Sequence, residues 1–347
     1  MTYRLAWRRY RLPFLRAVRT AHGPWLAREG LLVRREDDAG RAGFGEVAPI
    51  PWFGTETLAE AEAALAGLGD AAGATAIDGI DESCGCLRFA LAAAVEEVGR
   101  ADGGPPASAN ARLPVAALLP AGKAALAAAD KARADGYVAF KWKVGVLAGA
   151  DEQVLLDDLL ARLPKGAALR LDANGAWTAR QASRWLDRCA ERPIEFVEQP
   201  CFAEASAGAA AQRRTDDVLL GLARDYPTKL ALDESVAGWR ALQSWLARGW
   251  PGVLVVKPAL LGAPASVLAL LDQYHADAVF SSALETAVGR RAALRLAFSF
   301  KGAAARALGF GVAPLFEDTR FDCPPAPYLS IEDVSQIDPG ALWNALN

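Results

Sequence analysis

Short apolar runs alternate with longer amphipathic stretches over residues 113–312 of this chain. The runs have the length and the Val, Leu, Ile and Phe content of buried parallel strands, and apolar residues between them recur at helical spacing. The expected strands are residues 113–118, 137–144, 168–172, 194–199, 229–234, 253–257, 278–282 and 307–312. Helices are expected between them, including residues 121–134, 178–190, 237–248 and 263–274. Eight strand–helix repeats in about 200 residues predict an α/β barrel of the (β/α)8 type, a modified TIM barrel.

The residues before this alternation follow a different pattern. Residues 3–18 and 30–36 are expected as strands, and the glycines of residues 40–45 predict a turn into another strand. Two helices should follow, at residues 58–68 and at about residues 82–99, the first opened by a Thr-Glu-Thr sequence with the character of a capping box. Strands followed by helices indicate an α+β module.

A Gly/Pro cluster at residues 103–106 separates the two patterns and predicts a domain boundary. The expected organisation is an α+β N-terminal capping domain at residues 1–106, the barrel at residues 107–312 and a Pro-rich segment at residues 313–347 that packs back onto the capping domain. A doubly wound open sheet is the alternative to the barrel. It is disfavoured because no Gly-rich phosphate-binding sequence follows the first strand.

Composition limits the classes of function. The 347 residues are 52% hydrophobic and 23% charged with a net charge of −3, so they can bury a sizeable core but have no charge excess for nucleic acid or an acidic membrane surface. No apolar run approaches the roughly 20 residues of a membrane span, and arginines interrupt any signal-like run. Five unevenly spaced cysteines indicate free thiols in a reducing compartment. We therefore expect a cytoplasmic protein that acts on a small molecule, and no feature indicates a protein partner.

Charged residues stand at or next to the ends of five expected strands. They occur in the sequences Lys141-Trp142-Lys143, Asp172-Ala173-Asn174, Glu198-Gln199-Pro200, Asp233-Glu234-Ser235 and Lys257-Pro258. The carboxyl ends of barrel strands meet at one face of the barrel, where the active sites of such enzymes lie. The sequence therefore predicts that these side chains converge.

Lys141 and Lys143 share one face of their strand, because successive side chains point to opposite faces. Phe140, Trp142 and Val144 occupy the other face. In a half-exposed sheet the two lysines would form a solvated face. In a barrel the apolar face must contact the surrounding helices, and both lysines then point inward.

Asp172, Glu198 and Asp233 follow three successive expected strands. A single acid in this position is usually the N-cap of a helix, but three acids brought together repel one another unless a cation lies among them. Carboxylate oxygens select a hard divalent ion, so the sequence predicts Mg²⁺ as the cofactor, with Mn²⁺ as an alternative.

Lys257 ends a continuous apolar run typical of a buried strand, where its structural alternative is an ion pair with a neighbouring acid. Two ammonium groups on opposite sides of a substrate suit removal of a proton next to a carboxylate, with a metal ion stabilising the enediolate that forms. Burial and neighbouring cations lower the pKa of a lysine toward neutrality, which makes it a competent base.

Taken together, these motifs resemble the enolase superfamily, and in particular its muconate-lactonising-like subgroup, which carries Lys-x-Lys on the second barrel strand. The resemblance implies that Lys143 is the catalytic base, with Lys141 beside it and Lys257 opposite. It also implies that the three acids following successive strands bind Mg²⁺ and that Asn174 lies near the metal and the substrate.

Further segments resemble the o-succinylbenzoate synthases within this superfamily. They are residues 20–23 (TAHG), 43–57 (GFGEVAPIPWFGTET), 170–174 (RLDAN) and 281–286 (SSALET). The resemblance implies syn dehydration of 2-succinyl-6-hydroxy-2,4-cyclohexadiene-1-carboxylate to o-succinylbenzoate through an enediolate, in menaquinone or phylloquinone synthesis. Lys143 would remove the proton and then protonate the departing hydroxide, and Lys257 would stabilise the enediolate through a cation–π contact.

The same resemblance implies the substrate-binding residues, which are Asn174, Arg170, Ser281 and Gly309, with Gly311 an equal alternative to Gly309. A racemase of N-acylated amino acids or an epimerase of dipeptides is the alternative function, because it would use the same two lysines. Dipeptide epimerases typically carry an acidic motif near the eighth strand, and residues 309–312 contain none, which favours the synthase. A barrel that only binds a small acid would require all these charged residues to be incidental.

Overall fold

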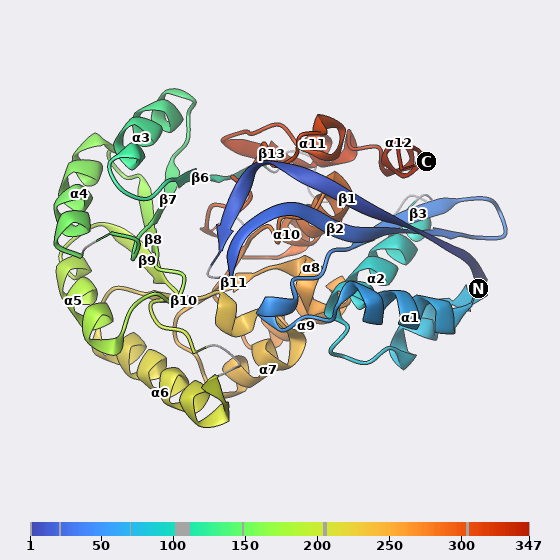
Figure 1. Ribbon diagram of the computed structural model, residues 1–347, viewed down its shortest axis with the longest axis horizontal. Coiled ribbons are helices and arrows are strands. Elements are labelled where there is room, and N and C mark those ends of the chain that lie inside the picture. Colours follow the sequence, from blue (N-terminus) through green and yellow to red (C-terminus); the bar gives the residue numbers. More distant parts are fainter. Residues whose placement is uncertain are drawn as a thin grey trace.

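The computed structural model describes residues 2–20, 22–69, 71–100, 112–147, 149–203, 207–302 and 305–346. An antiparallel sheet with two helices stands beside a larger body of parallel strands and helices (Figure 1). The C-terminal elements return to the antiparallel sheet. None of the helices in these ranges is long and apolar enough to cross a membrane.

Seven parallel strands form the central sheet, in the order β12-β11-β10-β9-β8-β7-β6. Their bounds are β6 (Ala116–Leu119), β7 (Ala139–Lys143), β8 (Ala168–Asp172), β9 (Ile194–Glu198), β10 (Leu230–Leu232), β11 (Val253–Val256) and β12 (Ala278–Phe280). Most of their residues are buried, because helices cover the outside of the sheet and side chains fill its inside. This architecture confirms the predicted modified TIM barrel.

The prediction of an eighth strand at residues 307–312 is wrong. Only two isolated bridges form there, pairing Leu308 with Val115 and Gly309 with Ser281. They still close the barrel, since the N–H of Ala116 donates to the carbonyl of Leu308 (2.9 Å) and the N–H of Gly309 donates to the carbonyl of Phe280 (2.7 Å). Glycines weaken a strand interior, which limits the pairing to these residues. The closure also excludes a doubly wound open sheet.

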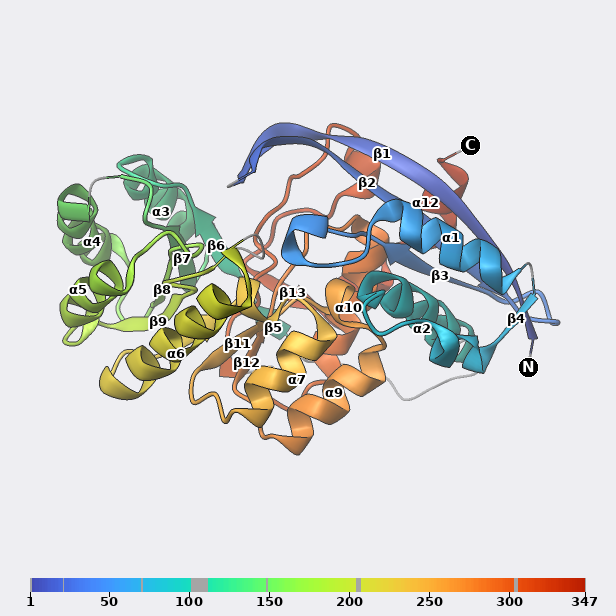
Figure 2. The same cartoon turned by 60° about the horizontal axis from the view of Figure 1, so that its bottom comes forward.

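Helices follow the barrel strands and pack outside them, as Figure 2 shows for α6, α7 and α9. Their bounds are α3 (Ala124–Ala134), α4 (Gly149–Arg162), α5 (Ala179–Cys189), α6 (Ala209–Asp225), α7 (Trp239–Ala247), α8 (Pro258–Leu261), α9 (Pro264–Gln273) and α10 (Ala287–Ser299). The four helices predicted explicitly are present as α3, α5, α7 and α9, each slightly shorter than expected.

The N-terminal part contains an antiparallel sheet in the order β3-β2-β1-β4. Its elements are β1 (Thr2–Thr20), β2 (Gly23–Glu36), β3 (Ala42–Val47), η1 (Pro51–Phe53), α1 (Leu58–Leu68), β4 (Ala71–Gly73), η2 (Ala74–Gly79) and α2 (Gly85–Arg100). The second strand begins earlier than predicted, because Gly23 already pairs with Thr20 across a tight turn. The predicted capping box is confirmed at Thr57, which exchanges hydrogen bonds with Glu60. In Figure 2 the β1–β2 hairpin reaches across to the barrel.

Two glycines of β3 set the distance between the antiparallel sheet and α2. A Cβ atom at Gly43 would overlap the carbonyl oxygen of Ala94, and a Cβ atom at Gly45 would overlap that of Ala90. The backbone of α2 therefore lies directly on β3, which no other residue type would allow at either position.

The C-terminal segment contacts both parts of the molecule. Its elements are η6 (Thr319–Phe321), β13 (Tyr328–Ser330), α11 (Ile331–Ser335) and α12 (Pro339–Asn344). Strand β13 pairs with β5 (Arg112–Pro114), so the first expected barrel strand is divided between β5 and β6. Phe316 bridges to Phe14 of β1, and Phe321 and Trp343 lie in the same buried apolar cluster. The predicted boundary at residues 103–106 lies outside the described residues, so the limits of the three predicted segments stay predictions.

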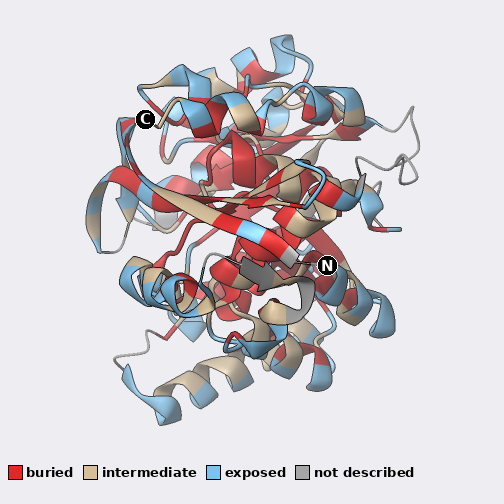
Figure 3. Cartoon of the chain, turned by 90° about the vertical axis from the view of Figure 1, so that its right-hand side faces the viewer, coloured by how far each residue is buried: buried red, intermediate tan, exposed pale blue. Residues whose placement is uncertain are grey.

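Buried residues concentrate in the centre of the molecule, whereas the outer helices carry exposed faces (Figure 3). The main apolar cluster includes Leu31 of β2, Phe89 of α2, Trp142 of β7 and Leu260 of α8. Because one cluster contains residues of both parts, the antiparallel sheet and the barrel share a continuous core.

A buried carboxylate, Glu46 of β3, joins the antiparallel sheet to helix α10. It accepts hydrogen bonds from the hydroxyl of Tyr10 (2.5 Å), the N–H and hydroxyl of Thr286 (3.0 and 2.5 Å) and the N–H of Gly289 (2.8 Å). Its side chain thus occupies the N-terminus of α10, where free N–H groups favour an anion.

We expect Glu46→Ala to lower the free energy of unfolding by at least about 2 kcal/mol, because it leaves several buried donors without an acceptor. Urea unfolding followed by circular dichroism measures the change. Glu29→Ala is the control, since Glu29 is exposed on β2 and should change stability by less than about 0.5 kcal/mol. Equal stability of the two variants would contradict a structural role for Glu46.

Candidate active site

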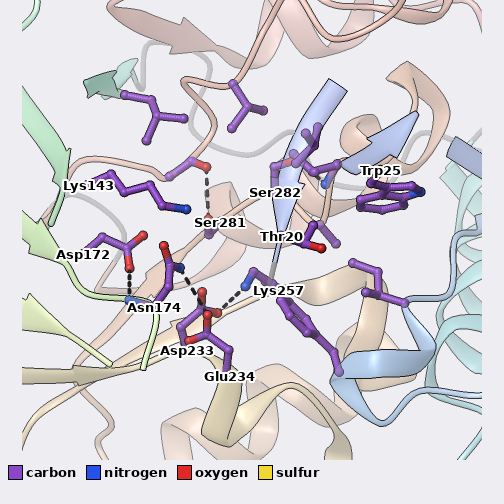
Figure 4. Close-up of a pocket in the computed structure, with 18 of the residues that line it drawn as sticks. Thr20, Trp25, Lys143, Asp172, Asn174, Asp233, Glu234, Lys257, Ser281 and Ser282 are labelled. Atoms are coloured by element: carbon purple, nitrogen blue, oxygen red, sulfur yellow. Dashed lines mark hydrogen bonds and ion pairs between the residues drawn. The ribbon is translucent and has the colours of Figure 1, made fainter. Parts of the chain in front are cut away.

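A cavity of about 560 Å³ opens at the carboxyl ends of the barrel strands. The β1–β2 turn and the η1 loop cover it from the antiparallel side, where Thr20 and Trp25 line the cavity (Figure 4). Its lining includes predicted site residues from six regions of the barrel: Lys141, Lys143, Asp172, Asn174, Asp233, Lys257, Ser281 and Gly309. The carboxyl-end residues therefore converge.

The charged residues stand on an apolar floor inside the barrel. Phe196, Ala231, Val255 and Val279 form a separate buried cluster, and each precedes a residue of the site by two positions. Since side chains two residues apart on a strand share a face, the floor lies one layer below the site. Each of these four side chains is at most 3% exposed, so the floor is closed to solvent.

Lys143 and Lys257 reach into the cavity from opposite sides (Figure 4). Phe140 and Trp142 of β7 are fully buried on the outer face, so the lysine pair points inward as predicted. Lys143 has no ion pair or hydrogen bond with any residue that the structure describes. The ammonium group of Lys257 contacts Asp233 and is 4.8 Å from the ring centroid of Phe53.

Lys141 lies between two of the predicted metal ligands. Its Nζ is 2.8 Å from Oδ2 of Asp172 and 2.6 Å from Oε1 of Glu198. The carboxylates of Asp172, Glu198 and Asp233 are all buried. A lysine next to each of them supplies positive charge where three acids would otherwise repel one another.

The site nevertheless holds more negative charge than the lysines neutralise. Burial, together with nearby Asp172, raises the pKa of Glu198 to about 8. Burial, together with Asp233, raises the pKa of Glu234 to about 7. The pKa of Lys141 is also raised, because its carboxylate neighbours outweigh the opposing effect of burial. Such carboxylates favour a further cation beside them.

Within the described ranges, no three Asp, Glu, His or Cys side chains are arranged to hold a metal ion. Asp172, Glu198 and Asp233 are instead joined through the ammonium groups. Each ammonium contacts one oxygen of a carboxylate, and the other oxygen of Asp172 accepts from the N–H of Asn174 (3.0 Å). The donor set itself, three oxygen-only side chains with surplus negative charge, fits a hard divalent ion that retains water ligands.

The predicted substrate-binding residues lie in two places around the cavity. Asn174 is held at the mouth by its amide, which donates to Glu234 Oε1 (3.2 Å). Ser281 and Gly309 meet on the other side, where the serine hydroxyl donates to the glycine carbonyl (3.1 Å). A Cβ atom at Gly309 would overlap the Ser281 hydroxyl, and Gly311 also lines the cavity.

Arg170 is not among the residues that line the cavity, and its predicted role in substrate binding stays a prediction. It precedes Asp172 by two residues and therefore points into the barrel one layer deeper. Its guanidinium is buried, stacks on Phe196 with 4.9 Å to the centroid, and binds Glu195 (2.7 Å). Arg306 joins this network, because it binds both Glu195 (2.6 Å) and Asp277 (2.7 Å). Arg170 thus belongs to a charged network below the floor.

Sequence patterns assign no individual role to several residues that shape the site. Glu234 is one of them, because its place in the Asp-Glu-Ser motif does not indicate a separate function. Gln199 ties β9 to the residues after β10, because its Oε1 accepts from the N–H groups of Asp233 (2.9 Å) and Ser235 (3.1 Å). Gln199 has a positive φ of 36°, which turns the chain at that point. Glutamine rarely adopts a positive φ, so the sequence does not predict this turn.

Comparisons with known proteins agree with this geometry. A family model described as "Enolase C-terminal domain-like" matches residues 123–328, and one described as "MenC, N-terminal domain" matches residues 3–98. The o-succinylbenzoate synthase of Thermosynechococcus vestitus is 40% identical over 314 residues, covering 89% of this chain and 92% of the relative. That of Edwardsiella ictaluri is 32% identical over 314 residues, covering 83% and 84%.

Among solved structures, o-succinylbenzoate synthase from Thermosynechococcus elongatus, with Mg in its active site, aligns with a TM-score of 0.83 and 36% identity over 99% of both chains. The L-Ala-D/L-Glu epimerase of Bacillus subtilis aligns with a TM-score of 0.78 over 94% of this chain and 95% of that one, but its 19% identity shows the fold alone. Fold and site thus define a member of the enolase superfamily. Within that class, the chain belongs to the family of o-succinylbenzoate synthases.

The charged network below the floor yields a test of its structural role. Hydrogen bonds from Arg306 lower the pKa of Asp277 to about 2 from its usual 3.8, and a hydrogen bond from Lys229 makes a smaller contribution in the same direction. A depressed pKa stabilises the fold above the unfolded value near 4, and that stability is lost as the pH falls toward 2. Because Asp277 is partly exposed, solvent screening reduces the contribution at neutral pH to about 1 kcal/mol.

We therefore expect Asp277→Asn to be less stable than the unaltered protein at pH 7, by about 1 kcal/mol, with the difference shrinking below about pH 4. Urea unfolding midpoints at pH 7, 4 and 3 measure it. Asp225→Asn, an exposed change on α6, is the matched control. A difference that stays constant with pH would show that the ion pairs are not its source.

Proposed function

We propose that the protein catalyses the Mg²⁺-dependent syn dehydration of 2-succinyl-6-hydroxy-2,4-cyclohexadiene-1-carboxylate to o-succinylbenzoate, a step in menaquinone or phylloquinone synthesis. One observation carries the proposal: two lysines on opposite sides of a cavity, beside buried carboxylates, in a chain 40% identical to a synthase of that name. Its five cysteines are free thiols, which fits a cytoplasmic location as part of the same proposal.

Lys143 is the base in this proposal. Because no described acid pairs with it, its amine is free to take the proton alpha to the ring carboxylate, leaving the electron pair as an enediolate. The carbon–oxygen bond of the ring hydroxyl then breaks, and Lys143 returns the proton to the departing hydroxide, which leaves as water. One residue on one face performs both transfers, so the elimination is syn.

Lys257 remains an ammonium throughout. The carboxylates of Asp233 and Glu234 outweigh its burial and raise its pKa, which keeps it charged at neutral pH. From the opposite side of the cavity it stabilises the negative charge that spreads over the ring and carboxylate in the enediolate. Lys141 holds Asp172 and Glu198 in place beside it.

Asp172, Glu198 and Asp233 are the proposed ligands of Mg²⁺. When bound, the ion supplies positive charge that makes the proton next to the ring carboxylate more acidic. Asn174 lies over the acids at the mouth of the site, where its amide is positioned to orient the carboxylate.

The remaining walls suit a ring with an acyl chain. Trp25, Trp52 and Phe202 give the cavity aromatic surface, whereas Ser281 and Gly309 provide polar groups on another side for the succinyl chain. The segment after the barrel closure, from Gly309 to Val312, lines the cavity without an acidic side chain. A dipeptide epimerase typically carries such an acid to bind the substrate amine, so the lining favours dehydration over dipeptide epimerisation.

We expect Lys143→Ala to lower kcat by about 10²–10⁴-fold, because it removes the general base. Absorbance of o-succinylbenzoate as it forms measures turnover. Lys165→Ala, an exposed lysine after α4, should retain wild-type activity. Turnover of the Lys143 variant above a tenth of wild type would remove this mechanism. Racemisation of an N-succinyl amino acid by a wild-type protein that forms no o-succinylbenzoate would establish the alternative function.

Removal of divalent ions with a chelator should abolish turnover, and Mg²⁺ should restore it. Mg²⁺ should also raise the melting temperature of the chelator-treated protein in proportion to the logarithm of its concentration, because it binds only the folded state. Asp233→Asn should weaken that rise by removing one ligand. A melting temperature that is independent of Mg²⁺ in the wild type would show that these acids hold no metal.

A further inference from the structure

We infer that Phe53, a residue of the N-terminal part, is a positioning residue for Lys257. The inference rests on the proposed function only for its assay. Lys257 contacts two groups of different character: a carboxylate of the barrel, Asp233, and the ring face of Phe53, with 4.8 Å between Nζ and the centroid. Its side chain is only 11% exposed, so both contacts act where water screens them little.

The two contacts act differently on the ammonium group. Asp233 attracts the ammonium group through a full negative charge. If Lys257 contacted this carboxylate alone, the carboxylate would cancel the positive charge that the substrate needs. The face of an aromatic ring attracts a cation through its quadrupole but carries no net charge and accepts no proton. Phe53 therefore holds the ammonium at the cavity wall while leaving its charge available to the substrate.

Phe53 is held rigidly enough to act in this way. It ends the short helix η1, where its N–H donates to the carbonyl of Ile50 (2.8 Å). Gly54 follows in the left-handed conformation with a φ of 86°, and its N–H donates to the carbonyl of Pro51 (2.9 Å). The hydroxyl of Thr55 accepts from the N–H of Ile50 (2.8 Å), which closes the loop.

A buried arginine fastens this loop to the antiparallel sheet. Arg28 of β2 donates to the carbonyls of Pro49 (2.6 Å) and Ala48, and its guanidinium lies 5.0 Å from the ring of Trp25. Trp25 in turn packs edge-to-face on Trp52, with 4.8 Å between centroids. The ring of Phe53 thus reaches Lys257 only when the loop lies on the barrel, so loop closure and the position of this charge are coupled.

The test replaces Phe53 with mono-, di- and trifluorophenylalanine, which weaken the quadrupole stepwise with little change in shape. We expect kcat for o-succinylbenzoate formation to fall at each step, by about 2- to 30-fold over the series, with KM changed less than about twofold. Phe53→Leu should have the same kcat as the trifluorophenylalanine variant. Phe53→Trp, which keeps an aromatic face, should have the kcat of the wild type. The same series at Phe89, buried in α2 with no cation in contact among the described residues, should leave kcat unchanged.

Two outcomes would overturn the inference. A kcat that is flat across the fluorinated series would show that Phe53 only fills space. A rise in KM with unchanged kcat would show that its ring contacts the substrate rather than positioning Lys257. Failure of the proposed function is distinguishable, because the wild-type protein would then form no o-succinylbenzoate in the same assay.

Discussion

The structure depends on one constraint, which is that charged groups inside a barrel must neutralise one another in layers. Four carboxylates and three lysines occupy the layer at the carboxyl ends of the strands, and an apolar layer headed by Phe196 lies directly below it. Arg170 is in register with Phe196 of this layer, stacks on its ring and pairs with Glu195. Most charges of the barrel interior therefore have a partner of opposite charge, and the site at the carboxyl ends keeps a surplus of negative charge. The layers arise because inward-facing side chains recur at every second residue of each strand.

The antiparallel sheet completes what the barrel alone lacks. The barrel supplies charge at its open end but no apolar cover, and a substrate with a ring needs both. The η1 loop and the β1–β2 turn provide aromatic surface over the charges. Arg28 holds the chain that leads into η1, and Glu46 joins the antiparallel sheet to α10, both through buried hydrogen bonds. The site is therefore a property of the interface between the two parts.

Much of the fold and of the site could be predicted from the sequence, because successive side chains of a strand point to opposite faces of the sheet. The inward orientation of Lys141 and Lys143 required only the apolar residues between them. Arg170 shows the limit of that reasoning. It shares a face with Asp172, but alternation along a strand does not tell how deep in the barrel a side chain lies, and Arg170 lies too deep to line the cavity. Gln199 and Phe53 escaped prediction because their roles depend on backbone turns and on contacts between distant segments.

The missing side chains of Gly43 and Gly45 have a consequence far from β3. Helix α2 rests on these glycines, and its first residue, Gly85, abuts the carbonyl of Leu260 in α8, where a Cβ atom would also overlap. Helix α8 begins directly after Lys257. The antiparallel sheet, α2 and α8 therefore form a stack. Its thickness is set by Gly43, Gly45 and Gly85, where there is no room for a Cβ atom. We conclude that the depth at which Lys257 enters the cavity depends on these distant contacts, so that a side chain added at any of the three glycines would displace Lys257 without touching the site.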